Sequence, residues 1–265
     1  MSPHSPVPNP PDFMVHTDPS FSLAQVWEWL SPKLFYNKIL GYRGSFFNDI
    51  AVGHPKATKL MGAVQEVQNI VLSSPHLMNP KLIWQFIPVT KENDSLTLRP
   101  ATLPGHERTL NFQRQQHPPH LSVTDFILPE DNIAFFACST GSLVNPTADE
   151  WETSGDYTKG FILRGLALAS AEALIELLHR HIRAIWGFPD PPELSTTDVL
   201  KGLYRGARYS FGYPSCPELE NQQIIWDLLD PTSVGISLTE GFMMEPEASV
   251  SGFVLHHPRA RHFKV

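Results

Sequence analysis

The sequence predicts an α+β protein in which a mostly antiparallel, twisted sheet is packed by helices, one of them long. The first observation is a series of short β-rich runs between residues 81 and 140, separated by Asn, Asp, Gly and Pro. Spacings this short favour antiparallel pairing over parallel crossovers. The second is one long amphipathic segment at about residues 156–186. With 265 residues, 42% of them hydrophobic, the chain can also bury a sizeable core.

The N-terminal part of the chain divides at about residue 20. Residues 1–20 predict a flexible, partly extended leader, because their prolines deny the segment regular hydrogen bonding. In residues 21–42, apolar positions favour short helical pieces that break at Pro32. Residues 55–73 predict an amphipathic helix. Its apolar face carries Leu60, Val64, Val67 and Val71.

Five runs in the middle of the chain are rich in β-forming residues and predict strands. They are residues 81–89, 95–100, 108–115, 120–128 and 132–140. Each run is short and is bounded by turn-forming residues, so we expect neighbouring runs to pair in one antiparallel sheet.

The longest predicted helix covers about residues 156–186, with Asp156 as a candidate N-cap. At ~1.5 Å per residue it spans roughly 45 Å, which is long enough to back a whole sheet. Its buried face is built from Leu163, Leu166, Leu174, Leu177, Leu178, Ile182 and Ile185. The elements predicted after it are helices over residues 197–204 and 217–229 and strands over residues 234–244 and 249–257.

Composition argues against nucleic-acid and membrane functions. The formal charge is −7 and no run of Lys and Arg occurs, so the basic stripe that a phosphate backbone needs is missing. The most apolar stretch, residues 161–178, is interrupted by Arg164, Glu172 and Glu176, so we expect a core helix rather than a membrane span. The N-terminus shows no signal-peptide pattern. We therefore expect a soluble protein.

Familiar catalytic and metal-binding motifs are missing from the sequence. The 12 histidines lack the spacing of HExxH or of Cys/His clusters, so no metal site is expected. GxGxxG, P-loop and GxSxG motifs are absent as well, so nothing in the sequence supports a nucleotide-binding or serine-hydrolase function. Cys138 and Cys216 cannot form a disulfide framework, so we expect ordinary buried thiols in a cytoplasmic protein.

The stretch RGARYSFGYPSCPELE, residues 205–220, has the composition of a ligand cradle. Arg208 offers a planar charged fork that suits a carboxylate. Gly212 allows the backbone of 209–213 to approach a bound group, and Tyr213 adds a flat apolar face. Together these groups suit a small zwitterion with a flat base. The alternative is that Arg208 makes only a surface ion pair and that Gly-Tyr-Pro is only a turn.

A polar stripe runs along the long predicted helix. Glu172, Glu176, His179 and Arg183 are spaced i, i+4, i+7 and i+11, so they share one face. One interpretation is a solvated face on which Glu176 pairs with Arg180. The other is a carboxylate held near a cationic or hydroxyl-bearing ligand. Local chemistry by itself favours the solvated face.

Several motifs then follow one another in a specific order. Arg-x-x-x-Gly-Tyr-Pro with Cys-Pro begins at Arg208, Leu-Thr-Glu stands at 238–240, and Ser-Val-Ser-Gly stands at 249–252. The longer stretches that contain or flank them are residues 156–188, 204–229, 238–253 and 257–263, with weaker ones at 77–81, 108–116, 122–126 and 133–141. With these motifs, most of residues 21–263 resembles the activation (reactivation) domain of cobalamin-dependent methionine synthase.

The resemblance implies a C-shaped single domain over residues 21–265 that binds S-adenosylmethionine in a shallow groove. It implies repair of oxidised cobalamin: a flavodoxin-like or other reductase supplies an electron, and the domain presents S-adenosylmethionine as the methyl donor. Carried over by motif, Arg208 grips the ligand carboxylate and Glu172 lies near the ligand. The adenosyl side is implied to be lined by the backbone of Ser210 and Gly212 and by Tyr213. His262 stands in place of a tyrosine on the ligand side. In the implied mechanism the protein only positions the methyl donor, so no catalytic side chain is expected.

The sequence also departs from the family. A ligand-binding aspartate has no clear match in 21–45, where only Glu28 is nearby, and Tyr209 and Phe211 replace prolines. Neither an Asp-x-His-x-x-Gly cobalamin motif nor the zinc-ligand cysteines of a homocysteine module occurs, so any cobalamin must be carried by a partner protein.

We therefore expect a stand-alone component of a methyltransferase that acts only with a cobalamin-binding methionine synthase module. Two alternatives remain open. One is a non-catalytic regulatory protein that binds S-adenosylmethionine. The other is a reactivating protein for a different corrinoid methyltransferase.

Overall fold

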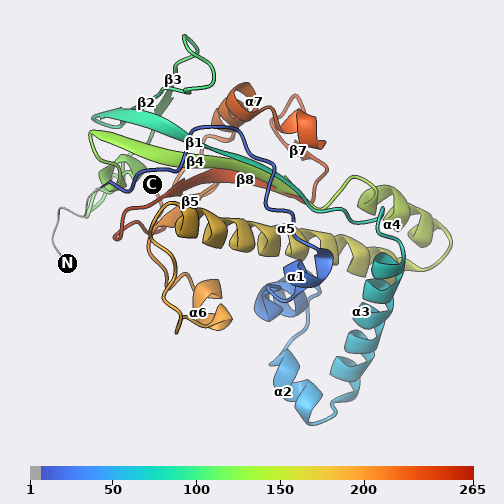
Figure 1. The fold of residues 1–265 in the computed structure, drawn as a ribbon. Coiled ribbons are helices and arrows are strands. Elements are labelled where there is room, and N and C mark those ends of the chain that lie inside the picture. Colours follow the sequence, from blue (N-terminus) through green and yellow to red (C-terminus); the bar gives the residue numbers. More distant parts are fainter. Residues whose placement is uncertain (1–6) are drawn as a thin grey trace.

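An antiparallel sheet forms the centre of the molecule (Figure 1). The structure is a computed structural model that describes residues 7–265, and in that range the main sheet has six strands in the order β3-β2-β1-β4-β8-β5. Neighbouring strands pair antiparallel throughout. The strands are β1 (Lys81–Glu92), β2 (Ser95–Leu98), β3 (Arg108–Asn111), β4 (Glu130–Ser139), β5 (Ala207–Tyr209) and β8 (Ser249–Leu255). The predicted α+β class is confirmed.

Helices cover both faces of this sheet (Figure 1). The long helix α5 (Tyr157–Ile185) lies along one face, where Leu174 packs in one cluster with Phe136 of β4. The helix α7 (Gln223–Leu229) packs on the opposite side, in the cluster that contains Phe135. Because successive side chains of a strand point to opposite faces, Phe135 and Phe136 enter different clusters. The predicted long helix is confirmed.

Further helices lie beside the N-terminal half of α5 or extend away from it (Figure 1). They are α1 (Leu23–Trp27), the π-helix η1 (Lys33–Ile39), α2 (Phe46–Ala51), α3 (Pro55–Ser73) and α4 (Val144–Thr153). The predicted face of α3 is buried at Val64, Val67 and Val71, whereas Leu60 is only partly buried. The helical structure is interrupted before Pro32, as predicted: α1 ends at Trp27, and Pro32 is the N-cap residue of η1. The sequence analysis missed α2 and α4, which are short and bury few apolar residues.

The leader lies on the main body of the protein. Three of its carbonyl oxygens accept hydrogen bonds from buried side chains of β1 and of the end of α5. The bonds run from Trp186 Nε1 to Pro8 O (3.0 Å), from Trp84 Nε1 to Asp18 O (2.6 Å) and from Gln85 Nε2 to Phe13 O (2.8 Å). A proline-rich extended chain leaves its carbonyls free, and buried donors need acceptors. Residues 8–18 are therefore anchored to the main body, although we expected a flexible segment. The first six residues of the predicted leader lie outside the described residues.

One predicted strand is replaced by a short helix, and one real strand was missed. Residues 120–128 contain a 3-10 helix, η2 (Val123–Phe126), in place of a strand. Ser122 and Asp125 form a capping box there, so local turn bonds satisfy backbone groups that a strand would have paired. The strand β5 (Ala207–Tyr209) is too short to show an alternating pattern.

The predicted strand over residues 234–244 is wrong, because the chain turns back there and forms two short strands that pair with each other. The last predicted strand is confirmed by β8. Asp156 stands at the N-cap position of α5, but its carboxylate lies 3.7 Å from Lys159 Nζ instead of capping the helix. The remaining elements are α6 (Thr196–Leu200), η3 (Leu219–Gln222), η4 (Pro231–Val234) and the paired strands β6 (Ser237–Leu238) and β7 (Met244–Glu245).

Cys138 and Cys216 are free and buried, which confirms the interpretation of both as ordinary thiols. Burial raises the pKa of each thiol to about 12, so both stay protonated at neutral pH. Within residues 7–265, no helix combines the length and the apolar character that a membrane crossing requires.

Candidate functional site

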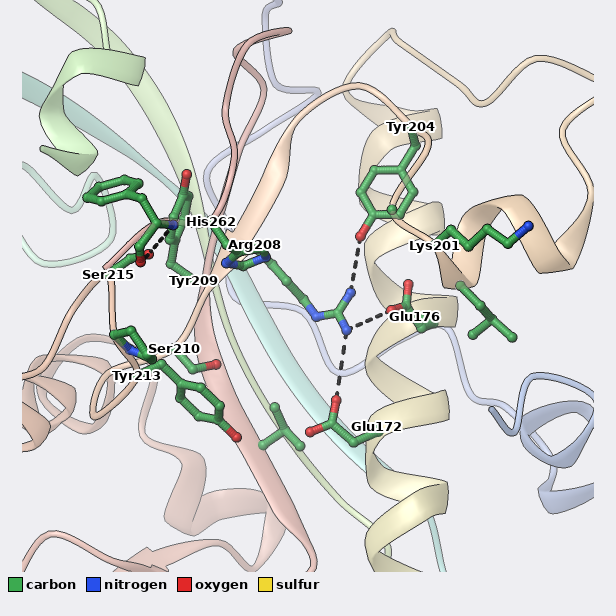
Figure 2. Close-up of a pocket in the computed structure, with 15 residues that line it drawn as sticks. Glu172, Glu176, Lys201, Tyr204, Arg208, Tyr209, Ser210, Tyr213, Ser215 and His262 are labelled. Carbon is green, nitrogen blue, oxygen red and sulfur yellow. Dashed lines mark hydrogen bonds and ion pairs between the residues drawn. The ribbon is translucent and has the colours of Figure 1, made fainter. Parts of the chain in front are cut away.

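A cavity of about 470 Å³ opens between α5 and the segment that follows β5 (Figure 2). We call it the arginine pocket, because the side chain of Arg208 extends into it. Side chains from α5, from the loop before β5, from the bend after β5 and from the C-terminal segment line it. The structure brings five predicted site residues together here: Glu172, Arg208, Ser210, Tyr213 and His262.

Side chains of β5 and of the two residues after it point alternately to the pocket and to the core. Arg208 and Ser210 point to the pocket side, whereas Tyr209 and Phe211 are 2% and 3% exposed and join the core. The ring of Tyr209 stacks on Phe253, with 5.6 Å between the centroids, and contributes only part of the pocket wall. The side chains of Tyr209 and Phe211 therefore belong to the core.

Arg208 reaches across the pocket from β5 to α5 (Figure 2). Its Nη2 lies 2.6 Å from Glu176 Oε1 and 3.8 Å from Glu172 Oε2, and its Nη1 donates to the Tyr204 hydroxyl at 3.3 Å. Burial disfavours the guanidinium charge, but Glu176, Tyr204 and Glu172 together outweigh this effect and raise the pKa of Arg208. The pocket therefore contains a permanent cation.

The bend after β5 is held by backbone geometry and by the C-terminal segment. Gly212 has a φ of +82°, and an added Cβ would lie 3.0 Å from Leu219 Cδ1, so glycine suits this position best. Ser215 Oγ donates to Phe263 O at 2.6 Å. This bond ties the bend to the end of the chain and brings the adjacent His262 to the pocket.

The interpretation of the polar stripe of α5 as a solvated face is wrong, because three of its four residues are buried and the fourth, Glu172, is partly exposed at the groove. Glu176 pairs with Arg208 across the groove and not with a neighbour on its own helix. His179 and Arg183 are each 0% exposed, and Arg183 donates to both carboxylate oxygens of Asp190 at 2.7 and 2.6 Å. The sequence analysis did not include Glu176 among the site residues. Its partner, Arg208, is 32 positions away in the sequence on β5, and no local pattern shows that the two are in contact.

The charges in the arginine pocket depend on one another. Burial raises the pKa of Glu172, the Arg208 charge partly opposes this, and the Glu176 carboxylate raises it further. Burial and the nearby Arg208 lower the pKa of His262, so its imidazole is neutral at neutral pH. The pocket thus contains the Arg208 guanidinium, the Glu176 carboxylate that pairs with it and the Glu172 carboxylate, whose pKa depends on both of them.

A second cavity of about 470 Å³, which we call the adjoining pocket, continues the groove. It shares Glu172, Ser210, Tyr213 and Val250 with the arginine pocket and is also lined by Gly212. Its other walls are largely apolar. The groove therefore suits a ligand with a carboxylate, a cationic centre and a flat apolar part. In the described range, residues 7–265, no three His, Cys, Asp or Glu side chains gather as a metal site would require.

Comparison with known proteins identifies relatives of this chain. The sequence model of a family described as "Vitamin B12 dependent methionine synthase, activation domain" matches residues 22–265. The methionine synthase of Mycobacterium leprae (strain TN) is 31% identical over 202 residues, which are 69% of this chain and 17% of that protein. The methionine synthase of Mycobacterium tuberculosis (strain ATCC 25618 / H37Rv) is 30% identical over 207 residues, which are 71% of this chain and 17% of that protein. This chain therefore spans less than a fifth of the length of these relatives.

A solved structure shares the fold. The crystal structure of the MetH reactivation domain bound to AdoHcy superposes with a TM-score of 0.87 at 24% sequence identity, covering 97% of this chain and 83% of that one. The shared fold has the same sheet and long helix that position Arg208 and Glu172 in this chain. Since the family model matches nearly the whole sequence, the chain belongs to the family of vitamin B12-dependent methionine synthase activation domains.

Proposed function

We propose that this chain binds S-adenosylmethionine in the groove and supports the reductive remethylation of cobalamin on a separate methionine synthase module. The observation that carries the proposal is the Arg208 guanidinium, which is only 19% exposed and yet faces the arginine pocket. A shielded arginine in a cavity is a strong anchor for a ligand carboxylate. The AdoHcy bound by the related MetH domain supports a ligand of this class.

Each part of S-adenosylmethionine has a matching group in the groove. The fork of Arg208 suits the carboxylate, and the 39%-exposed side chain of Glu172 suits the ammonium and sulfonium charges. The adenosyl part would lie against the backbone of Ser210 and Gly212, the ring of Tyr213 and the imidazole of His262.

The residues of this chain act by positioning. When bound, S-adenosylmethionine supplies the methyl group that reduced cobalamin on the partner accepts, after a flavodoxin-like or other reductase has delivered an electron. Arg208 and Glu172 orient the methyl donor, and the walls of the groove shield it from water. The chain is then a cytoplasmic methyltransferase component that needs a cobalamin-binding partner.

Titration calorimetry with S-adenosylmethionine tests the binding step. We expect saturable binding at one site, and the absence of saturable binding would contradict the proposal. A second assay combines this chain with a reductase and an oxidised cobalamin-dependent methionine synthase without its own activation domain. We expect synthase activity to return only when this chain and S-adenosylmethionine are both present.

The same assay separates the alternatives. Binding of S-adenosylmethionine without recovery of any cobalamin enzyme supports the regulatory alternative. If the activity of a different corrinoid methyltransferase returns and that of methionine synthase does not, the result supports the second alternative, a reactivating protein for that other enzyme.

A further inference from the structure

Two carboxylates approach the Arg208 guanidinium, but they do so in different ways (Figure 2). Glu176 lies 2.6 Å from Nη2, and its side chain is 11% exposed. Glu172 lies 3.8 Å from the same nitrogen, and its side chain is 39% exposed. The closer carboxylate is mostly shielded from water and lines the arginine pocket alone, whereas the farther one borders both cavities of the groove.

Tyr204 holds the other end of the guanidinium. Its hydroxyl accepts from Nη1 of Arg208 at 3.3 Å. The Tyr204 ring lies against two fully buried side chains of α5: the Arg183 guanidinium is 3.9 Å from the ring centroid, and the His179 ring meets it edge-on at 4.9 Å. Since Asp190 in turn binds Arg183 at 2.7 and 2.6 Å, the tyrosine has little freedom to move.

We infer that Glu176 and Tyr204 are positioning residues, which hold Arg208 so that its remaining donors meet the carboxylate of the ligand. The inference rests on the proposed function and assigns the two glutamates different tasks. Arg208 has five N–H donors, of which Glu176 and Tyr204 each engage one, so three are left for a ligand. Glu176 acts on the ligand only through Arg208, and Glu172 faces the cationic part of the ligand directly.

The burial of Glu176 favours this assignment over a purely structural one. Its second oxygen, Oε2, is buried, and within residues 7–265 it has no hydrogen-bond partner. The desolvation of the carboxylate is therefore offset mainly by Arg208. A buried ion pair stabilises a fold little more than a well-packed apolar pair does. Its clear effect here is to fix the direction of the guanidinium.

The test compares two ligands, S-adenosylmethionine and its decarboxylated analogue, which lacks only the carboxylate. In Glu176→Gln, we expect affinity for S-adenosylmethionine to fall about tenfold and affinity for the analogue to change less than about twofold. The matched control is Glu152→Gln, because Glu152 also pairs with an arginine, Arg164 of α5, but lies outside both cavities. This control should leave both affinities unchanged.

Equal losses for both ligands in Glu176→Gln would overturn the inference, because a residue that only stabilises the fold does not distinguish them. Unchanged affinity for S-adenosylmethionine would overturn it as well. Failure of the proposed function looks different: the unmodified chain would then bind neither ligand.

Tyr204→Phe provides a second test that keeps the ring over Arg183 and removes only the hydroxyl. We expect a loss of about threefold for S-adenosylmethionine and none for the analogue, since one weak bond to Arg208 is removed. This variant tests the inference even where Glu176→Gln does not fold. Equal affinity of Tyr204→Phe and the unmodified chain for S-adenosylmethionine would remove Tyr204 from the positioning set.

Discussion

Arg208 Nη2 on β5 lies 2.6 Å from Glu176 Oε1 on α5, so the edge strand of the sheet is tied to the long helix across the groove. Both side chains are mostly shielded from water, and their attraction is therefore screened less than that of a surface pair. This contact therefore gives Arg208 a shielded partner charge and links β5 to α5.

Arg208→Ala should weaken S-adenosylmethionine binding by about 2–4 kcal/mol, because the carboxylate loses a shielded charged partner. It should also lower the melting temperature, since Glu176 then stays buried without its ion-pair partner. Calorimetry and thermal denaturation measure the two effects. The control is Arg108→Ala, which removes an exposed pair with Asp227 at 3.3 Å and should change neither. Unchanged affinity in Arg208→Ala would place the ligand carboxylate elsewhere.

Glu172→Gln should weaken ligand binding by more free energy than it removes from folding. The side chain faces the groove, and glutamine has nearly the same shape as glutamate. AdoHcy has no sulfonium charge, so it should lose less affinity than S-adenosylmethionine. Titrations of both ligands, with melting temperatures measured in parallel, check this. A large drop in melting temperature with equal effects on both ligands would instead assign Glu172 a structural role.

Affinity for S-adenosylmethionine should rise with pH through the raised pKa of Glu172, above the ordinary value of 4.5. Deprotonation adds a negative charge that faces the cationic part of the ligand. The contribution of Glu172 to stability has the opposite slope: the folded state keeps the proton longer than the unfolded state, so this contribution falls as pH rises through the same window. A pH series of titrations and unfolding curves measures both slopes, and Glu172→Gln should flatten both.

Gly212→Ala should destabilise the protein by about 1–3 kcal/mol and weaken ligand binding. The matched control is Gly187→Ala, because Gly187 also has a positive φ, +93°, but an added Cβ there meets nothing within 4 Å. This control should show only the backbone penalty of about 1 kcal/mol. Chemical denaturation of both variants isolates the contact with Leu219. Equal losses of stability would mean that the bend tolerates a side chain.

Deletion of residues 1–20 should lower stability by about 1–3 kcal/mol for each buried donor that loses its acceptor. The three donors are Trp84 Nε1, Gln85 Nε2 and Trp186 Nε1. Deletion of residues 1–6 removes none of these bonds and serves as the control. Chemical denaturation of the two truncated chains measures the difference, and identical stabilities would show that the anchored segment contributes nothing.

Features set by neighbouring residues could be predicted from the sequence. The buried faces of α3 and α5 follow from apolar residues three and four positions apart, and such periodicity is local. The same holds for Arg208, Gly212 and Tyr213, where a fork, a bend and a flat ring occur within six residues. The turn in residues 120–128 is the exception, because its side chains satisfy the backbone locally and override the β-rich composition.

By itself, the sequence determined the class of the fold, the long helix and the presence of a charged fork beside a glycine bend. Only the tertiary structure decided that β5 pairs with β8, that α5 buries most of its polar stripe, and that Glu176 is the partner of Arg208. The physical reason is that periodicity is a property of one segment. Whether a charge is buried, and what it pairs with, depends on which distant segments exclude water from it.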